Sequence, residues 1–122
     1  MTGRPVRGMI VEVGLDPVVG HEQGRSRPCI VVQNDSGNRF STTTIIVPLT
    51  DAAHIRKPSP IYVPVNKGDG GLRKDSIALT DQIRAVDLAR VRRVIGALSS
   101  ETVAAVDRAL LISLGLHRPT RP

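Results

Sequence analysis

Aromatic side chains are nearly absent from this chain of 122 residues, which contains Phe40, Tyr62 and no tryptophan. Proteins that hold single-stranded nucleic acid by base stacking use several aromatic side chains. Any grip on such a partner would therefore have to come from charge and hydrogen bonds. Hydrophobic residues still make up 40% of the chain, so we expect a core of Val, Ile, Leu and Ala in a single domain of residues 1–116.

Cysteine is also scarce, since Cys29 is the only one. It cannot form an intramolecular disulfide, which favours the reducing cytoplasm, and its apolar surroundings predict a buried side chain. No apolar run approaches the about 18 residues of a membrane span, and the N-terminus shows no signal peptide, so no membrane partner is expected. The three histidines, His21, His54 and His117, are scattered. Their spacing predicts no metal site, and we expect no cofactor.

Positive charge, by contrast, is plentiful. Seventeen Lys and Arg residues against eleven Asp and Glu give a formal net charge of +6. A basic balance of this size favours a polyanionic partner, and Arg, which supplies most of the cations, suits bidentate contacts with phosphate. The alternative is a generic basic surface without a specific partner.

The segment from Gly20 to Asn38, GHEQGRSRPCIVVQNDSGN, is the most informative part of the sequence. It starts with a polar loop, continues with the strand-like apolar run of residues 28–32, and ends in a turn cluster of residues 34–38. Loops at the ends of rigid strands often carry binding and catalytic residues. An ordinary charged hairpin loop is the alternative. Within seven residues the loop holds an imidazole, a carboxylate, an amide and two guanidiniums: His21, Glu22, Gln23, Arg25 and Arg27.

This segment resembles the MazF/PemK family of toxin endoribonucleases, also called mRNA interferases. The resemblance rests on Gly-x-Glu-Gln-Gly, then Arg-Pro, then a strand that ends in Gln-Asn-Asp. It covers most of the chain, because further matches occur in order before and after the loop. They are Arg7-Gly8, residues 15–17 (LDP), 47–50 (VPLT), 74–76 (KDS), 81–84 (DQIR) and the helix-like segment that ends at Leu116.

Periodicity and turn residues predict a mainly β fold with a C-terminal helix. A helix is expected after a cap at Ser99 or Ser100, with an apolar stripe ending at Leu114 and Gly115 just beyond. The family resemblance implies an SH3-like small β-barrel of the CcdB/PemK type, built as a homodimer with active sites near the interface. Residues 117–122 are expected to be a disordered tail. The expected strands are residues 6–13, 28–33, 43–49, 61–65, 76–80, 83–86 and 94–98, with long loops at 14–27 and 50–60.

The resemblance implies catalytic roles for Arg27, which precedes a proline as in the family motif, and for Thr50. Metal-free RNA cleavage needs a base for the 2′-OH, help for the leaving 5′-oxygen and donors for the charged phosphorane. Arg27 suits the last role, since a guanidinium stays charged and presents a fork of donors; alternatively it only pairs with Glu22. Thr50 can hydrogen-bond a phosphate oxygen, but nothing nearby in the sequence looks like a base that would activate it.

The general base stays open between two residues of the loop. Glu22 is the leading candidate, although neighbouring arginines lower the pKa of a carboxylate and weaken it as a base. His21 has a more suitable intrinsic pKa, but we favour an exposed loop imidazole or a base contact as its interpretation. Asn34 and Asn38 can also be plain turn residues, and Arg7 a surface charge. The predicted RNA contacts are His21, Gln23, Arg25, Asn34, Asn38, Arg56, Lys57, Asp81, Gln82 and Arg7.

These features together predict a metal-independent, sequence-specific endoribonuclease. Its substrate would be single-stranded mRNA, and its products a 2′,3′-cyclic phosphate and a 5′-OH end. The resemblance also implies an acidic antitoxin whose disordered segment folds onto the basic groove. Two alternatives remain: a non-catalytic CcdB-like toxin that binds a protein target such as DNA gyrase, and an inactive homologue that only binds RNA or antitoxin.

Overall fold

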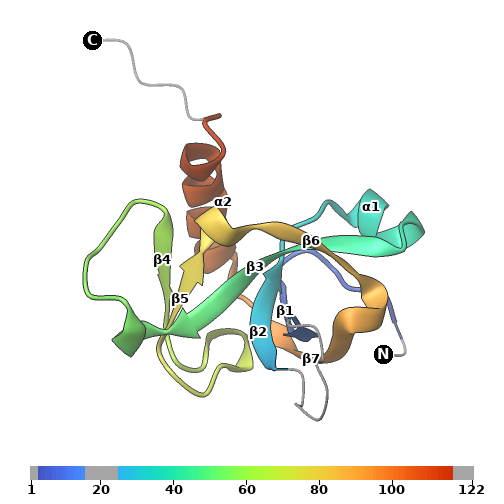
Figure 1. Ribbon diagram of the computed structural model, residues 1–122, viewed down its shortest axis with the longest axis horizontal. Helices are drawn as coiled ribbons and strands as arrows, with labels where there is room; N and C mark the ends of the chain where they lie inside the picture. Colours follow the sequence, from blue (N-terminus) through green and yellow to red (C-terminus); the bar gives the residue numbers. More distant parts are fainter. Residues whose placement is uncertain (1–2, 16–24, 117–122) are drawn as a thin grey trace.

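The computed structural model describes residues 3–15 and 25–116, and the predicted tail of residues 117–122 lies outside them. Figure 1 shows a curled sheet with the long helix α2 on one side and the short helix α1 near the start of the longest strand, β3. The elements, with η for a 3-10 turn, are β1 (Met9–Gly14), β2 (Ser26–Val31), α1 (Asp35–Phe40), β3 (Thr43–Asp51), η1 (Ala52–His54), β4 (Tyr62–Val65), η2 (Asp69–Gly71), β5 (Ser76–Leu79), η3 (Thr80–Gln82), β6 (Arg84–Asp87), η4 (Leu88–Arg90), β7 (Val91–Ala97) and α2 (Ser100–Ser113).

All strand pairs in the described part of the chain are antiparallel, in the order β4-β5-β3-β2-β1-β7, and β6 pairs with β3. The nine-residue β3 is shared: its first half pairs with β6, its last three residues pair with β5, and its other edge pairs with β2. The predicted mainly β fold with a C-terminal helix is confirmed. The sheet is not closed into a barrel, however, since β4 and β7 stand at opposite ends of the strand order. The turn η2 packs against β7 instead.

Strands β1 and β2 are buried on both faces, which explains their nearly continuous apolar sequences. Ile10 and Ile30 point into a core cluster shared with β3, β4, β5 and α2. Val11 and Cys29 point the other way, into a second cluster with residues of β3, β6 and β7. Cys29 is fully buried, as predicted, and this burial raises the pKa of its thiol to about 12.

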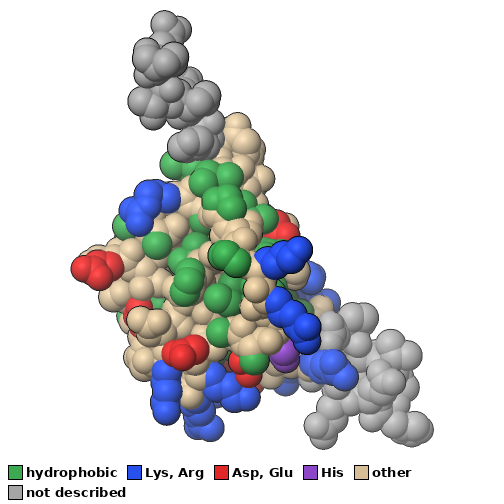
Figure 2. Space-filling model, turned by 90° about the vertical axis from the view of Figure 1, so that its left-hand side faces the viewer, with side chains coloured by type: hydrophobic (Ala, Val, Ile, Leu, Met, Phe, Trp, Pro, Cys, Tyr) green, Lys and Arg blue, Asp and Glu red, His purple; other side chains and the backbone are tan. Residues whose placement is uncertain are grey.

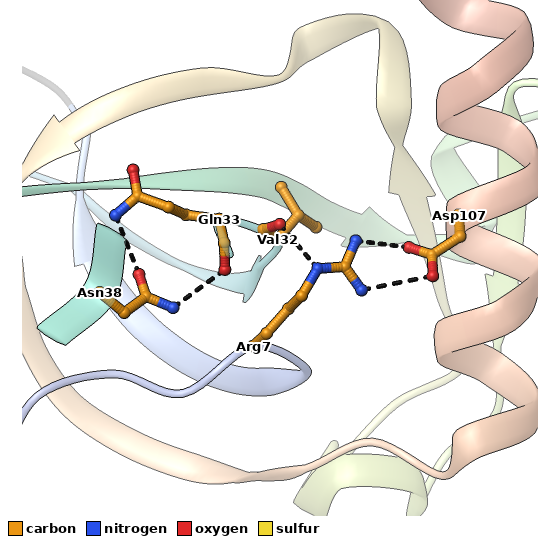
Figure 3. A network of polar contacts seen from close by, with 5 residues as sticks. All are labelled: Arg7, Val32, Gln33, Asn38 and Asp107. Atoms are coloured by element: carbon orange, nitrogen blue, oxygen red, sulfur yellow. Dashed lines mark hydrogen bonds and ion pairs between the residues drawn. The ribbon is translucent and has the colours of Figure 1, made fainter. Parts of the chain in front are cut away.

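Residues 34–38, predicted as a turn, belong instead to a helix cap and the short helix α1. The Asn34 side chain accepts a hydrogen bond from the Gly37 N–H at 2.7 Å and caps the helix. The residues that favour turns also favour helix N-caps, so composition alone did not separate the two. Asn38, in α1, is buried and exchanges hydrogen bonds with Gln33 (Figure 3).

Helix α2 has the predicted caps at both ends. The Ser99 side chain accepts from the Thr102 N–H, and Gly115 has a φ of +72° just past the helix end. Two hydrogen bonds, Gly115 N–H to Ile112 O and Leu116 N–H to Leu111 O, complete a Schellman motif. Neither this helix nor the shorter one in residues 3–15 and 25–116 is long and apolar enough to cross a membrane.

The apolar stripe of α2 covers the first core cluster through Val106, Ala109 and Leu110, whereas Leu114 is half exposed. On its neighbouring face, Asp107 forms an ion pair with Arg7 at 2.6 Å (Figure 3). The N-terminal segment and the C-terminal helix are therefore joined directly.

Candidate active site

One open groove with a volume of about 650 Å³ crosses the end of the sheet where β2 begins and β3 ends. Six segments contribute to it, most of them far apart in the sequence: β1, β2, β3 with the adjoining η1, residues 71–76 and β7. On the face shown in Figure 2, Lys and Arg side chains gather at the lower left and along the right-hand side, where a histidine lies beside them. The residues that line the groove are Glu12, Ser26, Arg27, Pro28, Leu49, Thr50, Asp51, His54, Gly71, Leu72, Arg73, Lys74, Ser76, Arg93 and Ile95.

The groove brings together Arg27 and Thr50, the two residues for which the family motif implies catalysis. Strand β2 pairs with β3 in a register that sets Cys29 opposite Pro48. Arg27 lies two residues before Cys29 and Thr50 two residues after Pro48, so both lie at the same end of this strand pair, and both line the groove. Both side chains lie at strand ends, Arg27 exposed and Thr50 partly exposed, so a polyanion in the groove can reach both.

Thr50 has a partner that the sequence analysis did not identify. Its Oγ1 lies 3.1 Å from Nδ1 of His54. The turn η1 creates this contact, because the Asp51 carboxylate accepts a hydrogen bond from the Ala53 N–H at 3.0 Å and bends the chain back after β3. Asp is a common cap and turn residue, but the sequence does not show that the turn after Asp51 returns the His54 imidazole to Thr50.

The two carboxylates of the groove are each bound to other groups. Glu12 accepts hydrogen bonds from Ser26 Oγ at 2.9 Å and from Arg93 Nε at 2.8 Å, and these bonds, in that order, hold the pKa of Glu12 below its usual value. The backbone N–H of Ala53 is the main reason for the lowered pKa of Asp51, with a smaller contribution from Lys74. Both groups are thus ionised at neutral pH and are weak proton acceptors.

Cations outnumber these carboxylates along the groove. Arg27, Arg73, Lys74 and Arg93 supply four positive charges against two negative ones, an excess of two. Arg73 and Lys74 were not among the predicted contacts; they precede β5 and are exposed. Their position favours a phosphate backbone as the ligand of the groove. The part of the chain that the structure describes contains no cluster of three or more metal-ligating side chains.

Three predicted site residues, His21, Glu22 and Gln23, lie outside the described residues. Their roles stay predictions, and so does the alternative that Glu22 pairs with Arg27. Arg25 is described and exposed, directly before β2, where its carbonyl accepts a hydrogen bond from the Leu15 N–H at 3.3 Å.

Three further predicted RNA contacts lie away from the groove. Arg27 is at the start of β2, whereas Arg7, Asn34 and Asn38 lie beyond its end at Val31. Arg7 donates to the Val32 carbonyl at 2.9 Å and pairs with Asp107, while Asn34 caps α1. Asn38 is only 2% exposed. The structure therefore gives all three side chains partners within the chain itself.

The remaining predicted contacts are exposed but do not line the groove. Asp81 and Gln82 lie in η3, and Arg56 and Lys57 follow η1 directly. Arg56 and Lys57 come two and three residues after His54, which lines the groove. These four contacts stay predictions.

Comparison with known proteins identifies the family. Residues 6–114 match the model of the "PemK-like, MazF-like toxin of type II toxin-antitoxin system" family. A curated relative, Endoribonuclease MazF of Staphylococcus epidermidis, is 41% identical over 111 residues, which cover 91% of this chain and 92% of that protein. The chain belongs to the PemK/MazF toxin family. The family predicted from the loop motif is thereby confirmed.

Solved structures of this family share the fold. An endoribonuclease in complex with its cognate antitoxin from a mycobacterial species superposes with a TM-score of 0.75 at 23% identity, covering 94% of this chain and 99% of that one. A MazE–MazF complex from Deinococcus radiodurans gives a TM-score of 0.76 at 25% identity, covering 93% and 97%. The open sheet with its C-terminal helix is thus the PemK/MazF toxin fold.

Proposed function

We propose that this chain is the toxin of a type II toxin–antitoxin pair and acts as a metal-independent endoribonuclease on single-stranded RNA. The observation that carries the proposal is the meeting of Arg27 and Thr50, 23 residues apart in sequence, in one groove with an excess of positive charge. The name of the staphylococcal relative, Endoribonuclease MazF, supports the same activity.

The proposed reaction is attack of a ribose 2′-oxygen on the adjacent phosphorus. The bond from phosphorus to the 5′-oxygen breaks, which leaves a 2′,3′-cyclic phosphate and a 5′-OH end. Arg27 stabilises the negative charge that builds up on the phosphorane oxygens, because its fork of N–H donors matches two of them. Thr50 hydrogen-bonds the reacting phosphate group. Glu22 or His21 remains the proposed base of the loop.

The proposed partners follow from the same groove. A cognate antitoxin with an acidic, disordered segment would cover the cations and compete with RNA. Two of the solved structures that share the fold are complexes with an antitoxin: the mycobacterial endoribonuclease with its cognate antitoxin, and MazE–MazF of Deinococcus radiodurans. We also propose a cytoplasmic homodimer that cleaves mRNA and thereby inhibits translation and growth.

The decisive test is cleavage of a long single-stranded RNA by the purified protein in excess EDTA. We expect discrete cuts, mapped by primer extension, with 5′-OH ends. Arg27→Ala should lower the cleavage rate by about 10²- to 10³-fold, since removing one transition-state donor typically costs that much. Arg108→Ala removes an equal charge from the exposed face of α2, outside the groove, and should leave the rate unchanged.

Other outcomes separate the alternatives. Intact RNA at high protein concentration would exclude the enzyme and favour a toxin that binds a protein target such as DNA gyrase. RNA binding without cleavage would indicate an inactive homologue. Cuts that require a divalent metal and persist in Arg27→Ala would contradict the proposed chemistry.

A further inference from the structure

We propose that His54 is a positioning residue that sets the direction of the Thr50 hydroxyl, so that Thr50 can take part in proton transfer from the RNA 2′-OH. The inference deepens the proposed ribonuclease function and rests on it. It is an alternative to Glu22 and His21 as the route for the 2′-OH proton, and it names a group near Thr50 that activates the hydroxyl.

The geometry that carries the proposal is the 3.1 Å contact between Thr50 Oγ1 and His54 Nδ1, with both side chains lining the groove. The backbone around this contact is held on several sides. Asp51 caps η1 through the Ala53 N–H, and the Ala52 N–H donates to the Asp75 carbonyl at 3.0 Å. His54 is thus placed beside Thr50 by the fold, although its side chain is exposed.

A hydroxyl has one hydrogen and two lone pairs, so its partner decides what it offers to a ligand. When Nδ1 of His54 carries no proton, Thr50 donates to it, and the lone pairs of Oγ1 are free to accept from a 2′-OH in the groove. When Nδ1 carries a proton, it donates to Oγ1, and the Thr50 hydrogen is released toward a phosphate oxygen. The hydrogen on Nδ1 therefore selects whether Thr50 acts as acceptor or donor; the imidazolium always carries it, and the neutral imidazole carries it in one of its two tautomers.

In the acceptor state the reaction balances as a relay. The 2′-OH proton passes to Oγ1 of Thr50 while the original Thr50 proton passes to Nδ1 of His54. The O2′–P bond forms, the P–O5′ bond breaks, and the departing 5′-oxygen takes a proton from water. The hydroxide that remains deprotonates the imidazolium, which restores neutral His54 and an unchanged Thr50.

Charged groups from several elements line the groove together with this pair. The carboxylates are Asp51, which caps η1, and Glu12 on β1. The cations come from β2, the segment before β5 and β7. These are Arg27, Arg73, Lys74 and Arg93, with Lys74 paired to Asp51 at 3.5 Å.

The simpler interpretation is that the hydrogen bond only stabilises the end of η1. The two interpretations differ in the pH dependence of cleavage and in how the effects of the two residues combine. We propose single-turnover cleavage of RNA from about pH 5 to 9, spanning the range in which an imidazole changes charge. The variants are His54→Ala, His54→Gln, Thr50→Ala and the double variant His54→Ala/Thr50→Ala, each checked for folding by thermal unfolding.

If His54 acts through Thr50, the wild-type rate should rise as the imidazole loses its proton. Near pH 9, His54→Ala should cleave about 10²-fold more slowly than the wild type, which is the smallest effect typical of a group that assists proton transfer. Its rate should no longer rise with pH. His54→Gln, which can still hydrogen-bond Thr50 but does not titrate, should recover part of the rate with a flat profile. The double variant should be no slower than Thr50→Ala.

A wild-type rate and pH profile in His54→Ala would overturn the inference. So would a double variant whose loss of cleavage rate equals the product of the two single losses, because the two residues would then act independently. In either case, cleavage that still depends on Arg27 would leave the proposed function standing. A wild-type protein that cuts no RNA at any pH would overturn both. The two failures are therefore distinguishable in one set of assays.

Discussion

At the scale of single residues, Asn38 shows how a polar side chain near a functional loop can belong to the fold. Its Nδ2 donates to the Gln33 carbonyl at 3.0 Å, and its Oδ1 accepts from Gln33 Nε2 at 3.1 Å and from Thr44 Oγ1 at 2.7 Å. Every buried side-chain polar atom in the described residues has such a partner. The amide fixes the start of β3 relative to α1.

Asn38→Ala should therefore lower the free energy of unfolding by about 1–3 kcal/mol, because it leaves the buried Gln33 and Thr44 groups unsatisfied. Urea denaturation would measure this. Asn34→Ala, at the exposed cap of the same helix, is the matched control and should cost only about 1 kcal/mol. An Asn38→Ala protein that is as stable as the wild type but binds RNA more weakly would contradict this structural role and favour a direct RNA contact.

The residues of the site were predictable to different degrees, for physical reasons. Arg27 stands in a dense local motif, and the family resemblance of that motif implied its catalytic role, which stays a prediction. Thr50 came only with the family pattern, because a hydroxyl at a strand end has no local signature. His54 was missed because its role depends on the fold of η1, and Arg73 because it approaches the groove from a segment 46 residues after Arg27.

At the scale of elements, the contact of η2 with β7 positions one wall of the groove. Gly70 and Gly71 have positive φ values, +63° and +81°, and lie against the backbone of β7. A Cβ at Gly96 would lie 2.7 Å from the Gly70 carbonyl carbon and closer still to its oxygen. The two backbones can approach only because Gly96 has no side chain, and Arg73 and Lys74 follow directly from this turn.

Gly96→Ala should thus displace η2 and destabilise the protein by about 1–3 kcal/mol, the usual cost of overpacking. It should also slow RNA cleavage, because the segment carrying Arg73 moves. Gly3→Ala is the matched control, since a Cβ at Gly3 meets nothing within 4 Å. Thermal unfolding and cleavage assays of both variants would measure the effects, and unchanged values for Gly96→Ala would contradict this packing.

The elements that the sequence predicted well are those with strong local patterns. The apolar runs of β2 and β3 and the capped, amphipathic α2 were located within a few residues. The start of β7 at Val91 was missed, because Arg92 and Arg93 do not read as strand residues. Both are exposed on a strand at the end of the sheet order, where charged side chains are tolerated. Strand order, and hence the open sheet, has no local pattern to predict it.

At the scale of the whole molecule, four of the Lys and Arg side chains that give the chain its net charge of +6 line the groove. With two aromatic side chains in the entire chain, of which neither lines the groove, binding should depend on charge. The affinity for single-stranded RNA should then fall steeply with salt concentration.

We expect Arg73→Ala to reduce the slope of log affinity against log salt by about 0.7, the value for one phosphate contact to a single strand. A 2′-O-methyl RNA, which cannot undergo 2′-oxygen attack, allows the measurement at equilibrium by fluorescence anisotropy. Arg108→Ala, with the same change in net charge, should leave the slope unchanged. Equal slopes for Arg73→Ala and the wild type would mean that RNA does not pass along this wall.

The dispersion of the groove over six segments has an evolutionary consequence. The strand ends that hold Arg27 and Thr50 continue into the buried parts of β2 and β3, whereas the residues 56–58 after η1 and 73–75 before β5 belong to neither core cluster and can change without repacking them. A lineage can therefore acquire a new RNA target by altering one surface segment at a time while it keeps the cleaving groups. Toxins that share this framework are free to diverge in what they cut before they diverge in how they cut it.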